Sequence, residues 1–218
     1  MKKISNILKQ DWLIIIFVFL GLALSIYFYP SLPDKIPFHW NADGNIDGYV
    51  SKAGVFTLPL INLGMYIMFL SLPHIDPKGE NYAKFDSTFQ YLKYLLIAFP
   101  LALEVYILLL ATGAIISRPI YMGIMFSLLF ILLGNVMGRI KYNYFIGLRV
   151  PWTLANEEVW RKTHRLAASL LVIGGFINLL LNLIGTNLMG IGVLINAAVV
   201  ITVPIVYSYF TYHKIVKE

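Results

Sequence analysis

Residues 12–29, WLIIIFVFLGLALSIYFY, decide the fold class of this chain, because no charged side chain interrupts them. A helix that crosses the hydrocarbon core of a bilayer needs about 20 mostly apolar residues. The stretch therefore predicts a transmembrane helix. The apolar run continues past the small-x-small site Ala23–Ser25, so we expect a retained helix and not a cleaved signal peptide.

Five further stretches have the same character, and lipid offers their backbones no hydrogen-bond partner, so each should be a helix. They are Val55–Leu72, Tyr94–Ile116, Ile120–Met137, Leu166–Ile184 and Leu188–Tyr209. The chain is 59% hydrophobic and only 13% charged, whereas a soluble domain carries roughly 25% charged residues. The sequence thus predicts an all-α polytopic membrane protein, a bundle of six transmembrane helices.

The basic residues predict the orientation of these helices, since cytoplasmic loops carry the excess of Lys and Arg. With the amino terminus inside, only Lys35, Lys52 and Arg118 of the 17 basic residues lie outside. Both termini are then cytoplasmic. The net charge of +6 is explained by this bias, so we expect no direct binding of nucleic acid. The chain has no cysteine, which excludes disulfides and thiolate chemistry.

The connections suggest three parts. Tight turns at 117–119 and 185–187 predict helix hairpins. Residues 1–72 form an amino-terminal two-helix unit with a structured outer loop at 30–54. Residues 73–119 provide an inner loop and the third helix, and residues 120–218 form a three-helix unit with an inner loop at 138–165.

The outer loop is shaped by prolines that prevent helix, and it is our candidate recognition surface for a peptide or a lipid headgroup. Its candidate residues are His39, Trp40, Asn41, Asp43, Asp47 and Tyr49. The alternative is that the rings rest at the membrane interface while the polar groups cap turns. Residues 43–48 match the start of a calcium loop, but Gly54 stands where its bidentate Glu is required, so no metal site is expected.

Three of the polar residues within the predicted spans are candidates for a special role: Glu104, Asn178 and Asn182. Glu104 lies near the middle of its helix, and an intramembrane carboxyl indicates function by default. The alternative is a protonated Glu that bonds to a neighbouring helix. Asn178 and Asn182 share a helix face with Gly174, which favours a packing seam over a conduction path.

The inner loop divides at Pro151. Before it, basic and aromatic residues including Arg139 and Arg149 suit anionic lipid headgroups. After it, Asn156 is a good N-cap for the fifth long helix, so we expect that helix to begin there. Trp152 and Trp160 are expected at the interface.

Motifs in both loops resemble a known family. The inner motifs are Gly134-Asn135, Gly138-Arg139, Asn143–Gly147, Arg149, Pro151–Leu154, Glu158–Trp160 and Thr163–Arg165. They resemble the signature of the SdpI family of bacterial immunity proteins. The outer motifs, Leu32-Pro33, Ile36-Pro37, His39–Asn41, Gly44, Asp47–Tyr49 and Ser51-Lys52, are similar to the uncharacterised amino-terminal domain that often accompanies that family.

The resemblance implies a multi-pass protein of the bacterial cytoplasmic membrane that protects its cell against a secreted peptide toxin related to SdpC. It also implies a receptor that holds a cytoplasmic repressor at the membrane. Candidate inner signalling residues are Asn135, Arg139, Asn143, Arg149, Pro151, Trp152, Thr153, Trp160 and His164. The expected partners are the toxin, membrane lipids and the repressor.

Two other functions stay open. A proton-coupled or small-molecule transporter could use Glu104, although no paired halves are visible. A membrane metalloenzyme could use His39, His74, His164 and Asp76, although no HExxH pair exists. We expect that the protein is not an enzyme and that it has no catalytic residue and no cofactor.

Overall fold

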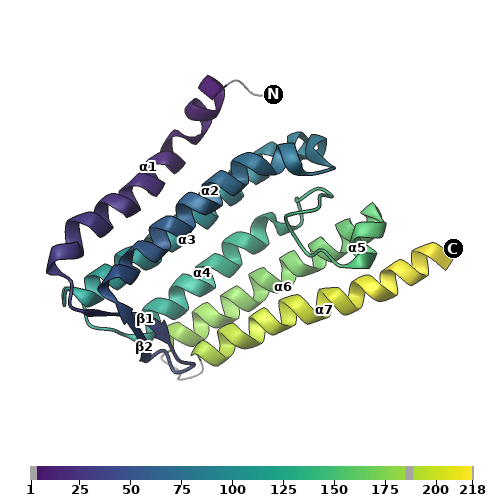
Figure 1. The fold of residues 1–218 in the computed structure, drawn as a ribbon. Helices are drawn as coiled ribbons and strands as arrows, with labels where there is room; N and C mark the ends of the chain where they lie inside the picture. Colours follow the sequence, from purple (N-terminus) through teal and green to yellow (C-terminus); the bar gives the residue numbers. More distant parts are fainter. Residues whose placement is uncertain (1–3, 185–188, 218) are drawn as a thin grey trace. The chain divides into compact units, whose positions relative to one another are not determined.

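The computed structural model describes residues 4–184 and 189–217, and within them six long apolar helices dominate the chain (Figure 1). These are α1 Ile4–Phe28, α2 Thr57–Ile75, α3 Asp86–Ala111, α4 Pro119–Met137, α6 Glu157–Leu183 and α7 Met189–Lys217. All six are long and apolar enough to cross a membrane. The predicted all-α, six-helix membrane fold is confirmed.

Short elements occupy the connections. They are the 3-10 helices η1 Tyr29–Ser31, η2 Lys52–Phe56 and η3 Gly79–Phe85, the helix α5 Pro151–Ala155, and the strands β1 Lys35–Trp40 and β2 Ile46–Ser51. The two strands pair antiparallel, so the outer loop is a β-hairpin, which the proline pattern did not predict. Asn41 closes its turn, because Oδ1 accepts from the backbone N–H groups of Asp43 and Asn45, both at 3.0 Å.

Helix α3 differs from the prediction at both ends. It begins at Asp86, ahead of the expected Tyr94, and it ends at Ala111 instead of Ile116. Gly113 stops it with φ +75°, and the Ala114 N–H bonds to the Leu109 carbonyl at 2.9 Å, as in a Schellman motif. The expected tight turn at 117–119 is therefore part of a longer connection.

Helix α6 begins as predicted. The side chain of Asn156 accepts from the backbone N–H groups of Glu158 at 2.8 Å and Val159 at 3.1 Å, so Asn156 is the N-cap. The turn predicted at 185–187 lies outside the described residues.

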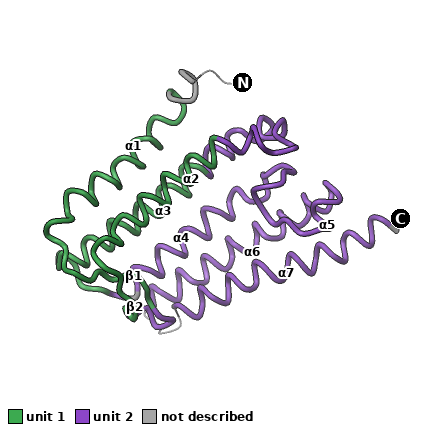
Figure 2. Tube along the Cα trace, viewed as in Figure 1, with its two compact units in different colours: residues 1–40, 46–70, 93–117 green, residues 41–45, 71–92, 118–218 purple. Residues whose placement is uncertain are grey.

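The chain divides into two compact units (Figure 2). Unit 1 contains residues 1–40, 46–70 and 93–117, and unit 2 contains residues 41–45, 71–92 and 118–218. Helices α2 and α3 supply residues to both.

In unit 1, α1 packs through a single stripe of buried residues. They are Asp11, Ile14, Val18, Gly21 and Ser25, at alternating spacings of three and four that place them on one helix face. Ile14 and Val18 pack with Ile97 of α3. A second cluster seats the hairpin, because Ile36 of β1 packs with Ile107 and Leu108 of α3.

In unit 2, glycines allow α4 and α6 to approach closely. A Cβ at Gly134 would lie 2.7 Å from Val172, and one at Gly175 would lie 2.7 Å from Ile131. Small residues serve this purpose in membrane helices, where close packing replaces the hydrophobic drive of water.

The orientation in the membrane can be tested because the chain has no cysteine. We predict that Asn45→Cys reacts with an impermeant thiol reagent in intact cells, whereas Glu157→Cys reacts only after lysis. Both side chains are exposed, and the basic residues place position 157 inside. Labelling of position 157 in intact cells would show that the protein has the opposite orientation.

Candidate functional site

The loop of unit 2 that the basic residues predict to be inner folds into a compact body together with the α2–α3 connection. We call this body, residues 76–82 and 140–164, the inner platform. Four of its motif side chains, Asn143, Thr153, Trp160 and His164, are at most 2% exposed. Their roles in the fold can be derived from their hydrogen bonds.

His164 joins the loop to α6 through both ring nitrogens. Nδ1 lies 2.8 Å from the carbonyl oxygen of Trp160, and Nε2 accepts from the Leu148 N–H at 3.0 Å. The first contact needs a proton on Nδ1 and the second needs a lone pair on Nε2, so the ring is the neutral Nδ1–H tautomer. The Trp160 ring stacks on it at 4.0 Å, and its Nε1 donates to the Ile140 carbonyl at 2.9 Å.

Gly147 makes this arrangement possible. Its φ is +119°, a region that is nearly restricted to glycine. A Cβ at this position would overlap Nε2 of His164. The glycine in the motif therefore allows the backbone to pass directly against the imidazole.

Asn143 and Thr153 organise the turns around it. Asn143 accepts from the N–H groups of Phe145 at 2.9 Å and Ile146 at 2.6 Å, and it donates to the Ile146 carbonyl at 3.0 Å. Thr153 donates to the Leu148 carbonyl at 2.7 Å and accepts from the Val150 N–H at 3.0 Å. These side chains satisfy backbone groups that have no partner in a helix or sheet.

The α2–α3 connection completes the platform. Asp76 accepts from the Tyr82 hydroxyl and from the Tyr144 N–H, both at 3.0 Å. Asn81 donates to the Tyr142 carbonyl at 2.8 Å. Two inner loops that are remote in the sequence are thus joined by buried polar contacts.

Tyr142 donates its hydroxyl to the Leu154 carbonyl at 2.6 Å. Burial is the largest of the causes that raise the pKa of Tyr142 to about 12. The neighbouring Tyr144 hydroxyl and the carboxylates of Glu157 and Asp76 also raise this pKa. The phenol therefore keeps its proton at neutral pH and remains a donor.

The other candidate inner residues face outward. Asn135, Arg139, Arg149 and Pro151 are exposed. Arg149 donates to the Tyr144 carbonyl at 3.0 Å, which uses one of the five guanidinium donors. Trp152 is half-buried and meets the Tyr209 ring edge to face at 5.2 Å. These residues are available to a partner or to lipid headgroups.

Among the candidate recognition residues of the hairpin, some are exposed and one is packed against α3. His39 Nδ1 and Asp47 Oδ1 form an exposed pair at 2.5 Å, and Tyr49 is 58% exposed. Trp40 instead packs on Tyr106 of α3 at 5.8 Å between ring centroids. The Trp40 ring is therefore mainly an anchor for the hairpin.

Within the described ranges, no three His, Asp or Glu side chains gather as a metal site. Asp47 is paired with His39. His164 and Asp76, considered for a metalloenzyme, both take part in the contacts that build the inner platform.

Glu104 lies on the seam between α1 and α3 in unit 1, and it is 1% exposed. The Ser25 Oγ lies 2.8 Å from Glu104 Oε1 and 3.1 Å from the Val55 carbonyl oxygen. One hydroxyl proton cannot serve both acceptors at full strength. Both contacts are satisfied when a protonated Glu104 donates to Ser25 and Ser25 donates to Val55.

Asn178 of α6 packs against α7. A Cβ at Gly192 of α7 would overlap Asn178, and one at Gly174 of α6 would overlap Asn196 of α7. Asn182 donates to the Asn178 carbonyl at 2.6 Å. This reciprocal arrangement of Asn against Gly supports the packing seam.

Sequence reasoning missed a second polar site on the α1–α3 seam. Asp11 and Lys93 form a buried ion pair with an N–O distance of 2.7 Å. Each lies one residue before the start of an expected span, so neither was considered as part of a buried polar site. The three-four spacing of Asp11 from Ile14 and Val18 was the available signal.

Comparisons with known proteins agree with the motifs. Residues 139–208 match the SdpI/YfhL protein family, and residues 16–63 match a domain of unknown function, DUF1648. The chain is 27% identical over 208 residues to the "Immunity protein SdpI" of Bacillus subtilis (strain 168), which covers 95% of this chain and 98% of that protein. No solved structure matches. The predicted resemblance and the multi-pass membrane localisation are confirmed.

Proposed function

We propose that this chain, whose residues 139–208 match the SdpI/YfhL protein family, is an immunity protein that protects its bacterium against a secreted SdpC-like peptide toxin. The observation that carries the proposal is the similarity to an immunity protein along nearly the whole of both chains. It includes the outer hairpin as well as the inner platform, so any activity that needs both regions can be shared.

The hairpin is the surface that we propose for toxin recognition. It is anchored by Ile36 and Trp40 on α3, while His39, Asp47 and Tyr49 remain exposed. An exposed aromatic ring beside a paired imidazole and carboxylate offers stacking area and directional polar contacts to a peptide. The rigid base costs the complex little ordering entropy.

The inner platform is the surface that we propose for a cytoplasmic repressor. Its buried hydrogen bonds fix the backbone, and Arg149 and Trp152 lie on the outside. Arg presents a rigid fork of donors to carboxylates, and Trp and Arg dominate binding energy at interfaces. The role is non-enzymatic, because binding surfaces suffice for it.

A challenge assay tests both parts. We expect a host sensitive to SdpC-type peptide to survive when it expresses the wild-type chain. Arg149→Ala should leave abundance and survival near wild type but weaken the binding that recruits a fluorescent repressor to the membrane by about 30-fold, since truncation of an interface hot spot costs about 2 kcal/mol or more. The matched control is Arg161→Ala, whose side chain is 52% exposed beside Glu158 and should change neither.

Two results would contradict the proposal. Death of the host at normal protein level would remove the immunity role. Parallel loss of survival and repressor recruitment in Arg149→Ala, again at normal protein level, would show that no dedicated signalling surface exists.

A further inference from the structure

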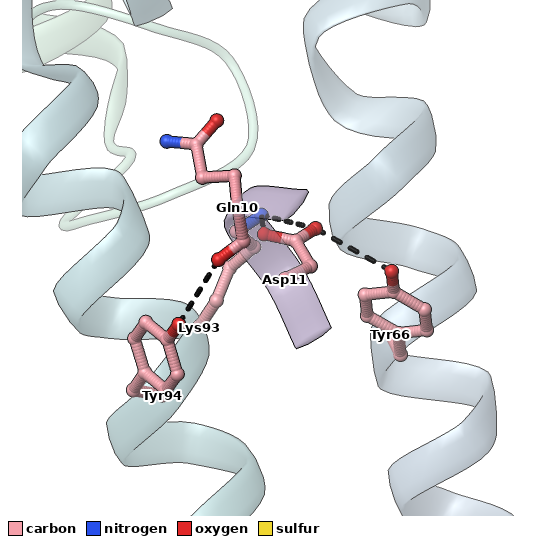
Figure 3. Close-up of polar contacts among 5 residues, drawn as sticks. All are labelled: Gln10, Asp11, Tyr66, Lys93 and Tyr94. Carbon is pink, nitrogen blue, oxygen red and sulfur yellow. Dashed lines mark hydrogen bonds and ion pairs between the residues drawn. The ribbon is translucent and has the colours of Figure 1, made fainter. Parts of the chain in front are cut away.

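A buried ion pair joins α1 to α3 inside unit 1 (Figure 3). Lys93 Nζ lies 2.7 Å from Oδ1 and 2.8 Å from Oδ2 of Asp11. The Asp11 residue is 1% exposed and Lys93 is 3% exposed. Both charges lie within apolar helices of spanning length, where ionisable residues are costly and indicate function.

Two tyrosines extend this contact to the neighbouring residues. The Tyr66 hydroxyl of α2 donates to Asp11 Oδ2 at 3.4 Å, and the Tyr94 hydroxyl donates to the Gln10 carbonyl at 3.0 Å. Figure 3 shows these side chains converging on one turn of α1. The carboxylate thus accepts from an ammonium group and from a phenol.

Outside this cluster α1 packs along a narrow seam. Its fully buried large apolar groups are Ile14 and Val18, and Phe17, Leu24 and Phe28 pack against the same clusters while partly buried. The seam ends at Gly21 and Ser25 against Glu104. Large apolar side chains elsewhere on α1 are exposed, such as Phe19 at 61% and Tyr27 at 77%. Release of α1 from α3 would therefore break the ion pair together with this narrow seam.

Helix α3 carries contacts of both candidate sites. Near its carboxyl end, Tyr106 and Ile107 support the hairpin. Near its amino end, Phe89 packs on Tyr82 of the inner platform at 4.9 Å between ring centroids. Lys93 follows this amino-terminal segment directly, so a change at the ion pair acts on the helix that both sites share.

We infer that the Asp11–Lys93 pair is a reversible latch that holds α1 against α3 at rest and opens when the protein responds to toxin. This inference rests on the proposed function. A buried ion pair is often no more stable than an apolar pair of similar volume, whereas loss of one partner leaves an unpaired buried charge. Such a contact is suited to two discrete states, as switching elements require.

The latch can be measured with spin labels on α1 and α3. Ile16→Cys and Ala102→Cys provide exposed label positions on α1 and α3 within unit 1 in a chain without cysteine. In nanodiscs, the labelled parent should show one short distance. Asp11→Asn should shift the main population to longer distances, and the exchange Asp11→Lys with Lys93→Asp should restore the short one. Lys9→Gln, which removes an exposed neighbouring lysine, is the matched control and should change nothing.

A second variant tests whether opening is needed. Asp11→Leu with Lys93→Met replaces the charges by apolar groups, so it should keep the short distance at normal abundance. We expect it to lose most protection in the challenge assay because α1 cannot release. An unchanged distance in Asp11→Asn, failed restoration by the exchange, or full protection by the apolar pair would overturn the latch. If the wild-type chain itself fails to protect, the proposed function falls, while the distances still decide whether the pair holds α1.

Discussion

Gly147→Ala is expected to dismantle the inner platform. The residue has φ +119°, and backbone strain of this kind costs about 1–3 kcal/mol in a residue with a Cβ. The new methyl group would also overlap Nε2 of His164 and displace the acceptor of the Leu148 N–H. An orphaned buried donor costs about 1–3 kcal/mol more. The two penalties act on the same loop.

Two glycines provide matched controls. Gly113 has φ +75° with open space around its Cβ position, so Gly113→Ala should show strain alone, about 1–2 kcal/mol. Gly64 lies within α2 and a Cβ there meets nothing within 4 Å, so Gly64→Ala should be neutral or slightly stabilising. Thermal unfolding in detergent, followed by Trp fluorescence, measures all three. Equal losses for Gly147→Ala and Gly113→Ala would show that the imidazole contact is unimportant.

Sequence alone predicted the six helices because lipid leaves the backbone no other choice over long apolar runs. It also predicted the start of α6, where the Asn156 cap is a local signal. The end of α3 was placed too late, although Gly113 carried the local signal for it. Capping residues close to a helix end are therefore sufficient to predict where that helix begins or ends.

The hairpin and the α1–α3 seam could not be predicted in the same way. Residues 35–40, KIPFHW, contain a proline and alternate poorly, yet they form a strand that pairs with β2 and packs through Ile36 on α3. Asp11 meets Lys93 across 82 positions of sequence. Such pairings depend on how helices pack, and neither helix contains that information by itself.

The motif residues show a related limit. Asn143, Thr153, Trp160 and His164 were predicted as signalling candidates, and the structure places them inside the platform, where they position the loop. Arg149 and Trp152, from the same motif, lie at its surface. The spacing of a motif alone cannot distinguish buried residues that position the loop from residues that are exposed on its surface.

Glu104→Ala is expected to destabilise the protein strongly, whereas Glu104→Gln should leave its stability and its protective activity nearly unchanged. Alanine would leave a cavity opposite Gly21, whose Cβ position is 2.6 Å from Glu104 Oε2, and large-to-small changes at buried sites cost about 2–5 kcal/mol. Glutamine keeps the volume of the side chain, and its amide donates to Ser25 as a protonated acid does.

The comparison separates packing from proton movement. Abundance, thermal unfolding and survival under SdpC-type peptide are measured for both variants, with Ser25→Ala as a further control, because it removes the same hydrogen bond from the α1 side and should cost about 1–3 kcal/mol. A glutamine variant that folds with normal stability yet fails to protect would mean that Glu104 must lose its proton during function. The transporter alternative would then displace the receptor, because an amide can copy the hydrogen bond of the acid but cannot release a proton in its place.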